Sequence, residues 1–193
     1  MILVDSNVLL DVFTREPQWY SWSLKALSDA SSTNRLVINP IIYSEVSIGF
    51  KSVQKLDLVL KEIGLLNEPL SPEVSLLAGK AFLWYKQKGG NKTSPLPVFF
   101  LGAHASNSNY KLLTKDRHRF LNYFPKLQII RPSTWSTRNL SWENIYRKMA
   151  TSDEDWSDWT LSLMMGWLWM NLSNNLFRFF ENWLICNFMS FNL

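Results

Sequence analysis

Three acidic residues stand next to short apolar segments, and these positions could carry catalytic or metal-binding groups. Asp5 directly follows the apolar run Ile2–Val4. Glu45 lies in an otherwise apolar stretch after a second such run, and Asp116 follows a third. Carboxylates that gather in one place repel one another, so such a cluster normally holds a divalent cation. Oxygen ligands favour Mg²⁺ or Mn²⁺, and two His with one Cys offer no zinc-ligand spacing.

A metal ion held by such carboxylates could support chemistry on a phosphodiester. It can orient a water, lower the pKa of that water and neutralise charge on the phosphate during in-line attack. Lys115, Arg117 and Arg119 flank Asp116 and could position a phosphate backbone. The net charge of +4 permits an anionic partner such as nucleic acid but does not establish one.

Each of these residues also has an ordinary structural explanation. Asp5 and Asp116 could each cap the helix or turn that follows, and Glu45 could lie on a solvated helix face. The three basic residues could form a solvated turn. His104, on an apolar helix, fits a half-buried structural histidine, and His118 fits a surface residue. The joint placement of the acids, rather than any single one, indicates a site.

The elements that must position these residues form an alternating pattern up to Pro132. Four short runs rich in Val, Ile and Leu predict strands buried on both faces. They are Ile2–Val4, Leu36–Ile38, 112–114 and 127–130. Apolar residues at three- and four-residue spacing predict the intervening helices, around residues 8–10, 17–30, 40–46, 51–63, 72–86 and 97–104. This alternation predicts an α/β domain with a mostly parallel central sheet, which places sites at the carboxyl ends of its strands.

The composition changes after Pro132, so we expect a domain over residues 1–132 and an extension of unknown role, possibly helical, over residues 133–193. Seven of the ten tryptophans lie in this extension. Residues 159–177 carry no charge and approach the length of a membrane span, but their Asn and Ser lower the hydrophobicity. Three interpretations are compatible with this composition: a helix on a membrane or partner surface, a spanning helix, or an appendage without selected function. Membrane contact is not the favoured one.

The cysteine content and the first residues indicate the compartment. Cys186 is the only cysteine, so no disulfide forms within the chain, and a reducing compartment is expected. Asp5 interrupts the apolar start of the chain, no basic region precedes it and no small-residue cleavage site follows. We therefore expect a cytoplasmic protein.

Four segments around the acids resemble a known family. Residues 1–10, 44–45, 99–105 and 112–120 are similar to PIN domains, most closely to the VapC-like toxins of bacterial and archaeal toxin–antitoxin pairs. The resemblance extends from Met1 to about Pro132. It implies a three-layer α/β/α sandwich and a Mg²⁺- or Mn²⁺-dependent endoribonuclease. It also implies a homodimer and a small cognate antitoxin that blocks the site.

Matched residue by residue, the resemblance implies that Asp5, Glu45 and Asp116 are the catalytic and metal-binding acids. It also implies that Asn7 and Thr114 are polar supports beside them. Lys115, Arg117 and Arg119 are expected, as above, to position the phosphate backbone of RNA.

One position departs from the family pattern. The family usually carries an Asp directly after the proline of residues 96–100, where this chain has Val98. Valine cannot ligate a metal or hold a water, and losing a comparable electrostatic contribution lowers rates by about 10²–10³. We therefore expect a weakened nuclease. The alternative is a catalytically inactive PIN domain that acts as an RNA- or antitoxin-binding regulatory module without dependence on Mg²⁺.

Overall fold

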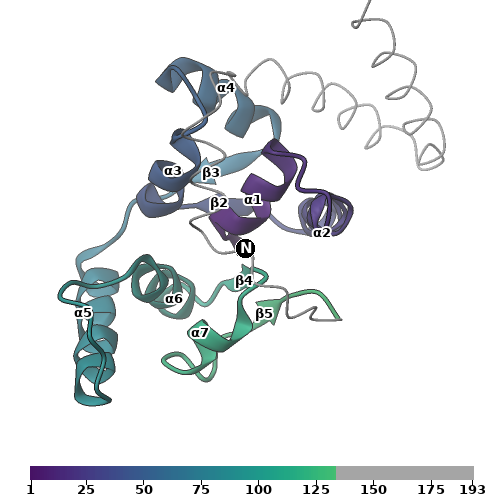
Figure 1. Cartoon of the computed structure of the whole chain (residues 1–193). Coiled ribbons are helices and arrows are strands. Elements are labelled where there is room, and N and C mark those ends of the chain that lie inside the picture. Colours follow the sequence, from purple (N-terminus) through teal and green to yellow (C-terminus); the bar gives the residue numbers. More distant parts are fainter. Residues whose placement is uncertain (134–193) are drawn as a thin grey trace, which may run out of the picture.

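A five-stranded parallel sheet lies at the centre of the fold. The structure is a computed structural model and describes residues 1–133 of the chain. Its strands are β1 (Ile2–Val4), β2 (Leu36–Ile38), β3 (Leu65–Asn67), β4 (Lys111–Leu113) and β5 (Ile129–Ile130). The strand order is β3-β2-β1-β4-β5, so β1 is central (Figure 1). Every residue of β1 and β2 is buried, which explains their unbroken Ile, Leu and Val composition.

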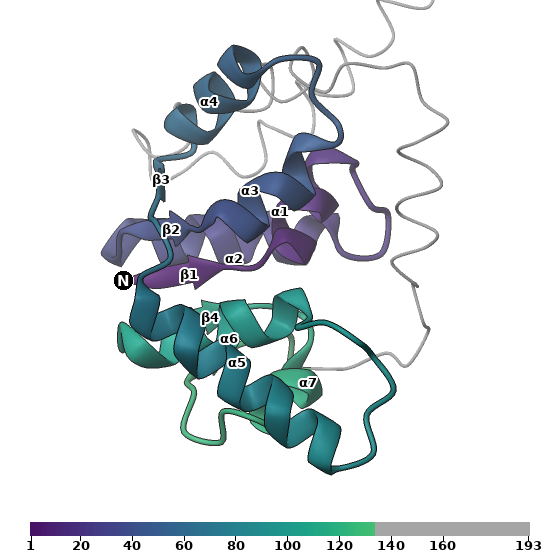
Figure 2. The ribbon, with the colours of Figure 1, turned by 90° about the vertical axis from the view of Figure 1, so that its left-hand side faces the viewer.

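Helices cover the sheet on two sides. Those in residues 1–133 are α1 (Ser6–Phe13), α2 (Tyr20–Thr33), α3 (Pro40–Ser47), α4 (Val53–Glu62), α5 (Pro72–Gln87), α6 (Pro97–Asn107) and α7 (Arg117–Leu121). Figure 1 shows α2 on one side of the strands and α5 with α6 on the other. Helices α5 and α6 pack side by side, as the rotated view in Figure 2 also shows. The predicted three-layer α/β/α arrangement with a parallel sheet is confirmed.

Local capping signals explain where several helices begin. The Oδ1 of buried Asn39 accepts hydrogen bonds from the backbone N–H groups of Ile41 and Ile42, at 3.1 and 3.0 Å. Ser71 caps α5 in the same manner through the N–H of Val74. Helices α3, α5 and α6 each place a proline at the first position, where no backbone N–H is needed.

The strand predictions succeed where the residues are buried and fail at the sheet edge. Strands β1 and β2 have the predicted bounds, and β4 is shifted by one residue. Of the strand predicted at 127–130, only Ile129 and Ile130 form β5. Strand β3 is missing from the prediction because Leu66 and Asn67 are exposed, which leaves Leu65 as its only buried residue.

Helix α2 begins later than the sequence predicts. The prediction starts at Pro17, whereas the helix starts at Tyr20. The carbonyl of Glu16 accepts hydrogen bonds from the N–H groups of Trp19 and Tyr20, so residues 16–19 form a turn before the helix. The expected extension lies outside the described residues, apart from Ser133. Within the part that the structure describes, no helix has the length and apolar character needed to cross a membrane.

Gly102 allows close packing between α6 and Phe124. A Cβ at Gly102 would lie 2.3 Å from Cδ2 and Cε2 of the buried Phe124 ring. We expect Gly102→Ala to lower the free energy of unfolding by about 1–3 kcal/mol, because the ring or the helix must shift. Gly79→Ala, with nothing within 4 Å of the added atom, is the matched control and should stabilise α5 by up to about 1 kcal/mol. Urea denaturation measures both changes, and equal effects would contradict the packing role.

Candidate functional site

The carboxyl ends of β1 and β4 bring several of the predicted residues together. Asp5 follows β1, Thr114 follows β4, and these two strands are neighbours in the sheet. The chain leaves β1 for β2 on one side, whereas β4 joins β1 on the other side. The strand order therefore reverses between β1 and β4, and open parallel sheets place their sites at this point.

The carboxylate of Asp5 is buried, accepts hydrogen bonds from two side chains and lies beside a third. Its Oδ2 accepts from Thr114 Oγ1 at 2.6 Å and from Asn7 Nδ2 at 2.7 Å. Its Oδ1 lies 3.2 Å from Ser6 Oγ. Asp5 occupies the N-cap position of α1 but makes no side-chain capping hydrogen bond. Its hydrogen bond from Thr114 joins the ends of β1 and β4. The side-chain capping that the sequence allows for Asp5 is therefore not observed, and a role of Asp5 at a metal site stays a prediction.

Glu45 is linked to Asp5 through a serine hydroxyl. Ser6 Oγ donates to Glu45 Oε2 at 2.6 Å and also lies beside the Asp5 carboxylate, so it stands between the two acids. Burial raises the pKa of Glu45 to about 7, and the nearby charge of Asp5 contributes in the same direction. Burial also raises the pKa of Asp5, although its hydrogen bonds oppose this. Glu45 therefore does not lie on a fully solvated helix face, and Ser6 is a site residue that our prediction omits.

Asp116 contributes to the site through its charge and also caps a helix. Its Oδ1 accepts from the backbone N–H of Arg119 at 3.3 Å, and its Oδ2 lies 3.0 Å from Arg119 Nε. The capping interpretation of Asp116 is thus confirmed. Its backbone N–H donates to Thr114 Oγ1 at 3.0 Å, and its negative charge contributes to the raised pKa of Asp5.

These acids suit a divalent cation by their chemistry, although they do not form a complete site. Within residues 1–133, no three His, Cys, Asp or Glu side chains converge as a metal site would require. Asp5 and Glu45 nevertheless offer oxygen ligands only, and both are destabilised as anions by burial and by a neighbouring negative charge. A bound cation would relieve this repulsion. The donor set therefore fits Mg²⁺ or Mn²⁺ better than a soft metal.

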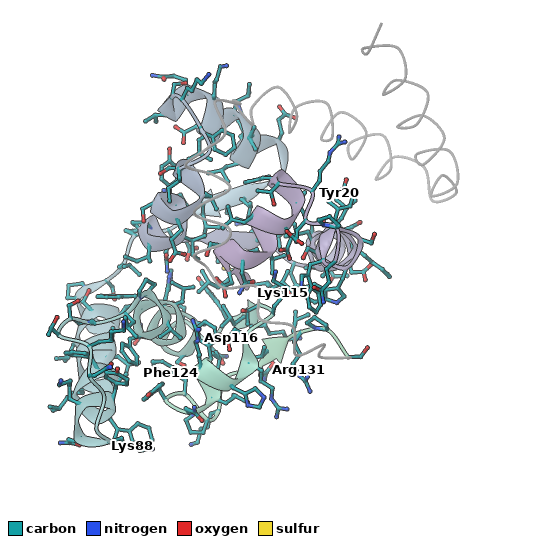
Figure 3. All side chains as sticks on the ribbon, viewed as in Figure 1. Tyr20, Lys88, Lys115, Asp116, Phe124 and Arg131 are labelled. Atoms are coloured by element: carbon teal, nitrogen blue, oxygen red, sulfur yellow. The ribbon has the colours of Figure 1, made fainter. Side chains whose placement is uncertain are left out.

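The three basic residues predicted to contact RNA have different environments. Arg117 is exposed, and Arg119 is 65% exposed although it pairs with Asp116. Lys115 is only 13% exposed, and its Nζ lies 2.5 Å from Asp11 Oδ1. The solvated-turn interpretation therefore holds for the two arginines but not for Lys115. Figure 3 shows Lys115 on the side of α2 and Asp116 on the side of α7.

His104 is more buried than the half-buried histidine that the sequence predicts, and Val98 is partly buried. His104 is buried, with Nδ1 at 3.3 Å from Asn39 Nδ2 and Nε2 at 3.6 Å from Glu68 Oε2. Its interpretation as a structural histidine is confirmed. Val98 lies in the first turn of α6, is partly buried and packs against the hydrophobic core.

The raised pKa of Glu45 makes stability depend on pH. Between its ordinary value of 4.5 and about 7, the folded protein holds a proton that the unfolded chain releases, so stability falls as the pH rises. Glu45→Gln should remove this fall and raise the free energy of unfolding by about 2–3 kcal/mol near pH 8. Urea denaturation near pH 5 and near pH 8 measures the change.

The control for this experiment is an exposed carboxylate. Asp29→Asn neutralises one partner of the Lys25–Asp29 ion pair, whose side chains are 64% and 66% exposed. This variant should keep the pH dependence of the parent protein. If Glu45→Gln also keeps the pH dependence of the parent protein, burial of the Glu45 carboxyl is not the cause of that dependence.

Comparisons with known proteins agree with this architecture. No protein-family model matches the chain, and no curated protein matches it. Among solved structures, VapBC2 from Rickettsia felis, bound to a DNA fragment from its promoter, matches with a TM-score of 0.51 and 20% identity. The match covers 69% of this chain and 100% of the other. VapBC-1 from nontypeable Haemophilus influenzae matches with a TM-score of 0.50 and 20% identity, over 68% of this chain and 98% of the other.

At this level of identity the likeness shows a shared fold. In the described part of this chain, that fold consists of an all-parallel sheet with helices on its two sides. The part of the chain that the structure describes therefore has the fold of a VapC-like PIN domain.

Proposed function

We propose that this chain is the toxin component of a toxin–antitoxin pair and hydrolyses RNA phosphodiester bonds with Mg²⁺ or Mn²⁺. The observation that carries the proposal is the pair of partly or fully buried carboxylates, Asp5 and Glu45, joined by Ser6 at the point where the strand order reverses. The fold shared with VapBC structures supports the same conclusion.

Each residue has a distinct role in this proposal. Asp5, Glu45 and Asp116 would hold the cation, and Asn7 and Thr114 would fix the Asp5 carboxylate through their hydrogen bonds. When bound, the cation would lower the pKa of a water and neutralise charge on the phosphodiester. The basic residues 115, 117 and 119 are proposed to serve the RNA backbone, with the two exposed arginines best placed for direct contact.

The remaining proposals concern partners and organisation. A small cognate antitoxin is the proposed protein partner, because the matching structures are VapBC complexes. We also propose a homodimer in the cytoplasm, with the nuclease domain in residues 1–132 and a separate extension in residues 133–193.

A second candidate function follows from Val98. This side chain packs against the core at the position where the family resemblance implies an acid. A domain without this acid could bind RNA or antitoxin as a regulatory module and cleave nothing. Binding of this kind would not depend on Mg²⁺ or Mn²⁺, whereas cleavage would.

Metal-dependent RNA cleavage by the full chain tests the proposed function. The parent protein, Val98→Asp, and Val98→Asp combined with Asp5→Asn are each incubated with structured and single-stranded RNA, in Mn²⁺ or in EDTA. We expect cleavage by Val98→Asp in Mn²⁺, none in EDTA, and none when Asp5 is also replaced. RNA binding without cleavage by every variant, unchanged by EDTA, would instead favour the regulatory module.

A further inference from the structure

We propose that Asp11 is a positioning residue that holds the ammonium of Lys115 away from the carboxylates, so that Asp5 and Glu45 remain available to a divalent cation. The inference rests on the proposed function, because it concerns the same site. It assigns a role to a buried ion pair that the sequence does not suggest.

The backbone of Lys115 already lies within the site. Its N–H lies 3.4 Å from Asn7 Oδ1, and Asn7 in turn donates to Asp5. Its chain neighbours are Thr114, which donates to Asp5 at 2.6 Å, and Asp116. A lysine at this position has a flexible four-carbon stem and a compact charge that can adopt more than one direction.

The side chain of Lys115 is nevertheless held on the side of α1 and α2. Its Nζ pairs with Asp11 Oδ1 on α1, and it lies 5.4 Å from the ring centroid of Trp19. Ser23 on α2 fixes the other oxygen of Asp11 through a hydrogen bond of 2.6 Å. Asp11 is 1% exposed, so this carboxylate has little freedom to follow a moving ammonium. Figure 3 shows the resulting direction of Lys115, away from α7.

The release of Lys115 would affect the carboxylates directly. The negative charge of Asp116 acts on Asp5, and the negative charge of Asp5 acts on Glu45. An ammonium that moved toward them would be attracted by this unbalanced charge. It would then occupy the place of the divalent cation and weaken its binding.

Two single substitutions that break the same ion pair separate this role from a structural one. Asp11→Asn breaks the pair and leaves the ammonium of Lys115 free to move, whereas Lys115→Met breaks the pair and removes the ammonium. If the pair only stabilises the fold, the Lys115 ammonium stays on the side of α1 and α2 in Asp11→Asn, and each variant changes cation binding only by the small effect of one distant charge. The proposed role predicts opposite outcomes, and the double variant Asp11→Asn/Lys115→Met should then behave like Lys115→Met.

Calorimetric titration of the full chain with MnCl₂ is the first measurement. We expect Asp11→Asn to weaken Mn²⁺ binding about tenfold, as one added positive charge near the ligands would. Lys115→Met and the double variant should bind within about threefold of the parent protein, because neither contains a competing ammonium. Asp29→Asn also removes one negative charge, but from an exposed ion pair, and should bind Mn²⁺ as tightly as the parent protein does.

The position of the Lys115 ammonium without metal is the second measurement. A crystal structure of metal-free Asp11→Asn should show Lys115 Nζ within hydrogen-bonding distance of Asp5 or Glu45. An ammonium that stays on the side of α1 and α2 in folded Asp11→Asn overturns the inference, as does equally weak Mn²⁺ binding by both single variants. A parent protein that binds no Mn²⁺ would contradict the proposed function, and the metal-free position of Lys115 would still decide the inference.

Discussion

Replacing Val98 by Asp is expected to raise the rate of Mn²⁺-dependent RNA cleavage by about 10²–10³, the size of a single lost electrostatic contribution at an active site. Val98 lies in the first turn of α6, and this helix contacts both β1 and β4. The family resemblance implies an acid at this position, so we expect an introduced carboxylate to join the acids at the ends of these strands.

The local structure should tolerate this substitution. Leu96, the N-cap of α6, makes no side-chain capping bond, and the first turn contains no acidic residue. A negative charge near a helix N-terminus is favourable because it faces the backbone N–H groups there. The lost packing of Val98 is limited, since its side chain is only partly buried. We therefore expect the gain in rate without a large change in stability.

The measurement compares initial rates of RNA cleavage at saturating Mn²⁺, with thermal unfolding of each variant recorded alongside. Val98→Asn is the matched control, because it has nearly the same shape as the aspartate variant but no charge, and it should gain little. Equal rates for the parent and Val98→Asp would show that three acids suffice and that position 98 lies outside the essential set. Equal gains by Asn and Asp would show that polarity, rather than charge, is what Val98 lacks.

The sequence predicts the parts of the site that depend on strand ends. Asp5 follows one predicted buried strand and Thr114 ends another, and parallel strands bring their carboxyl ends to one edge of the sheet. Their neighbourhood could therefore be predicted without coordinates. The missed edge strand β3 shows the limit of this reasoning, because an exposed strand has no buried run to identify it.

The contacts that join separate elements could not be predicted in this way. Ser6 meets Glu45 across 39 residues, and Lys115 meets Asp11 across 104 residues. The direction of Lys115 depends on how α1 and α2 pack against the loop after β4. Charged residues follow it in the sequence, so local reasoning allows a solvated turn. Periodicity determines which face of an element is buried, but the partner of a polar side chain depends on the whole fold.

The Asp11–Lys115 pair gives the second large expected effect. Lys115→Met should lower the free energy of unfolding by about 3–5 kcal/mol, because it leaves a buried carboxylate without its cation. Ser23 would then be the remaining side-chain partner of Asp11, through one hydrogen bond. Lys25→Met, in the exposed pair with Asp29, is the control and should change stability by less than about 1 kcal/mol.

The pH dependence of this loss identifies its cause. Burial already raises the pKa of Asp11, and the charge of Lys115 opposes this increase. Without the ammonium the pKa rises further, so the folded protein takes up a proton that the unfolded chain releases, and stability falls as the pH rises. Urea denaturation should show a larger loss for Lys115→Met near pH 8 than near pH 5. The double variant Asp11→Asn/Lys115→Met should recover part of the stability and lose this pH dependence, because no buried charge remains unpaired. A loss that is equal at both pH values would instead assign the effect to the packing of the lysine stem against Trp19.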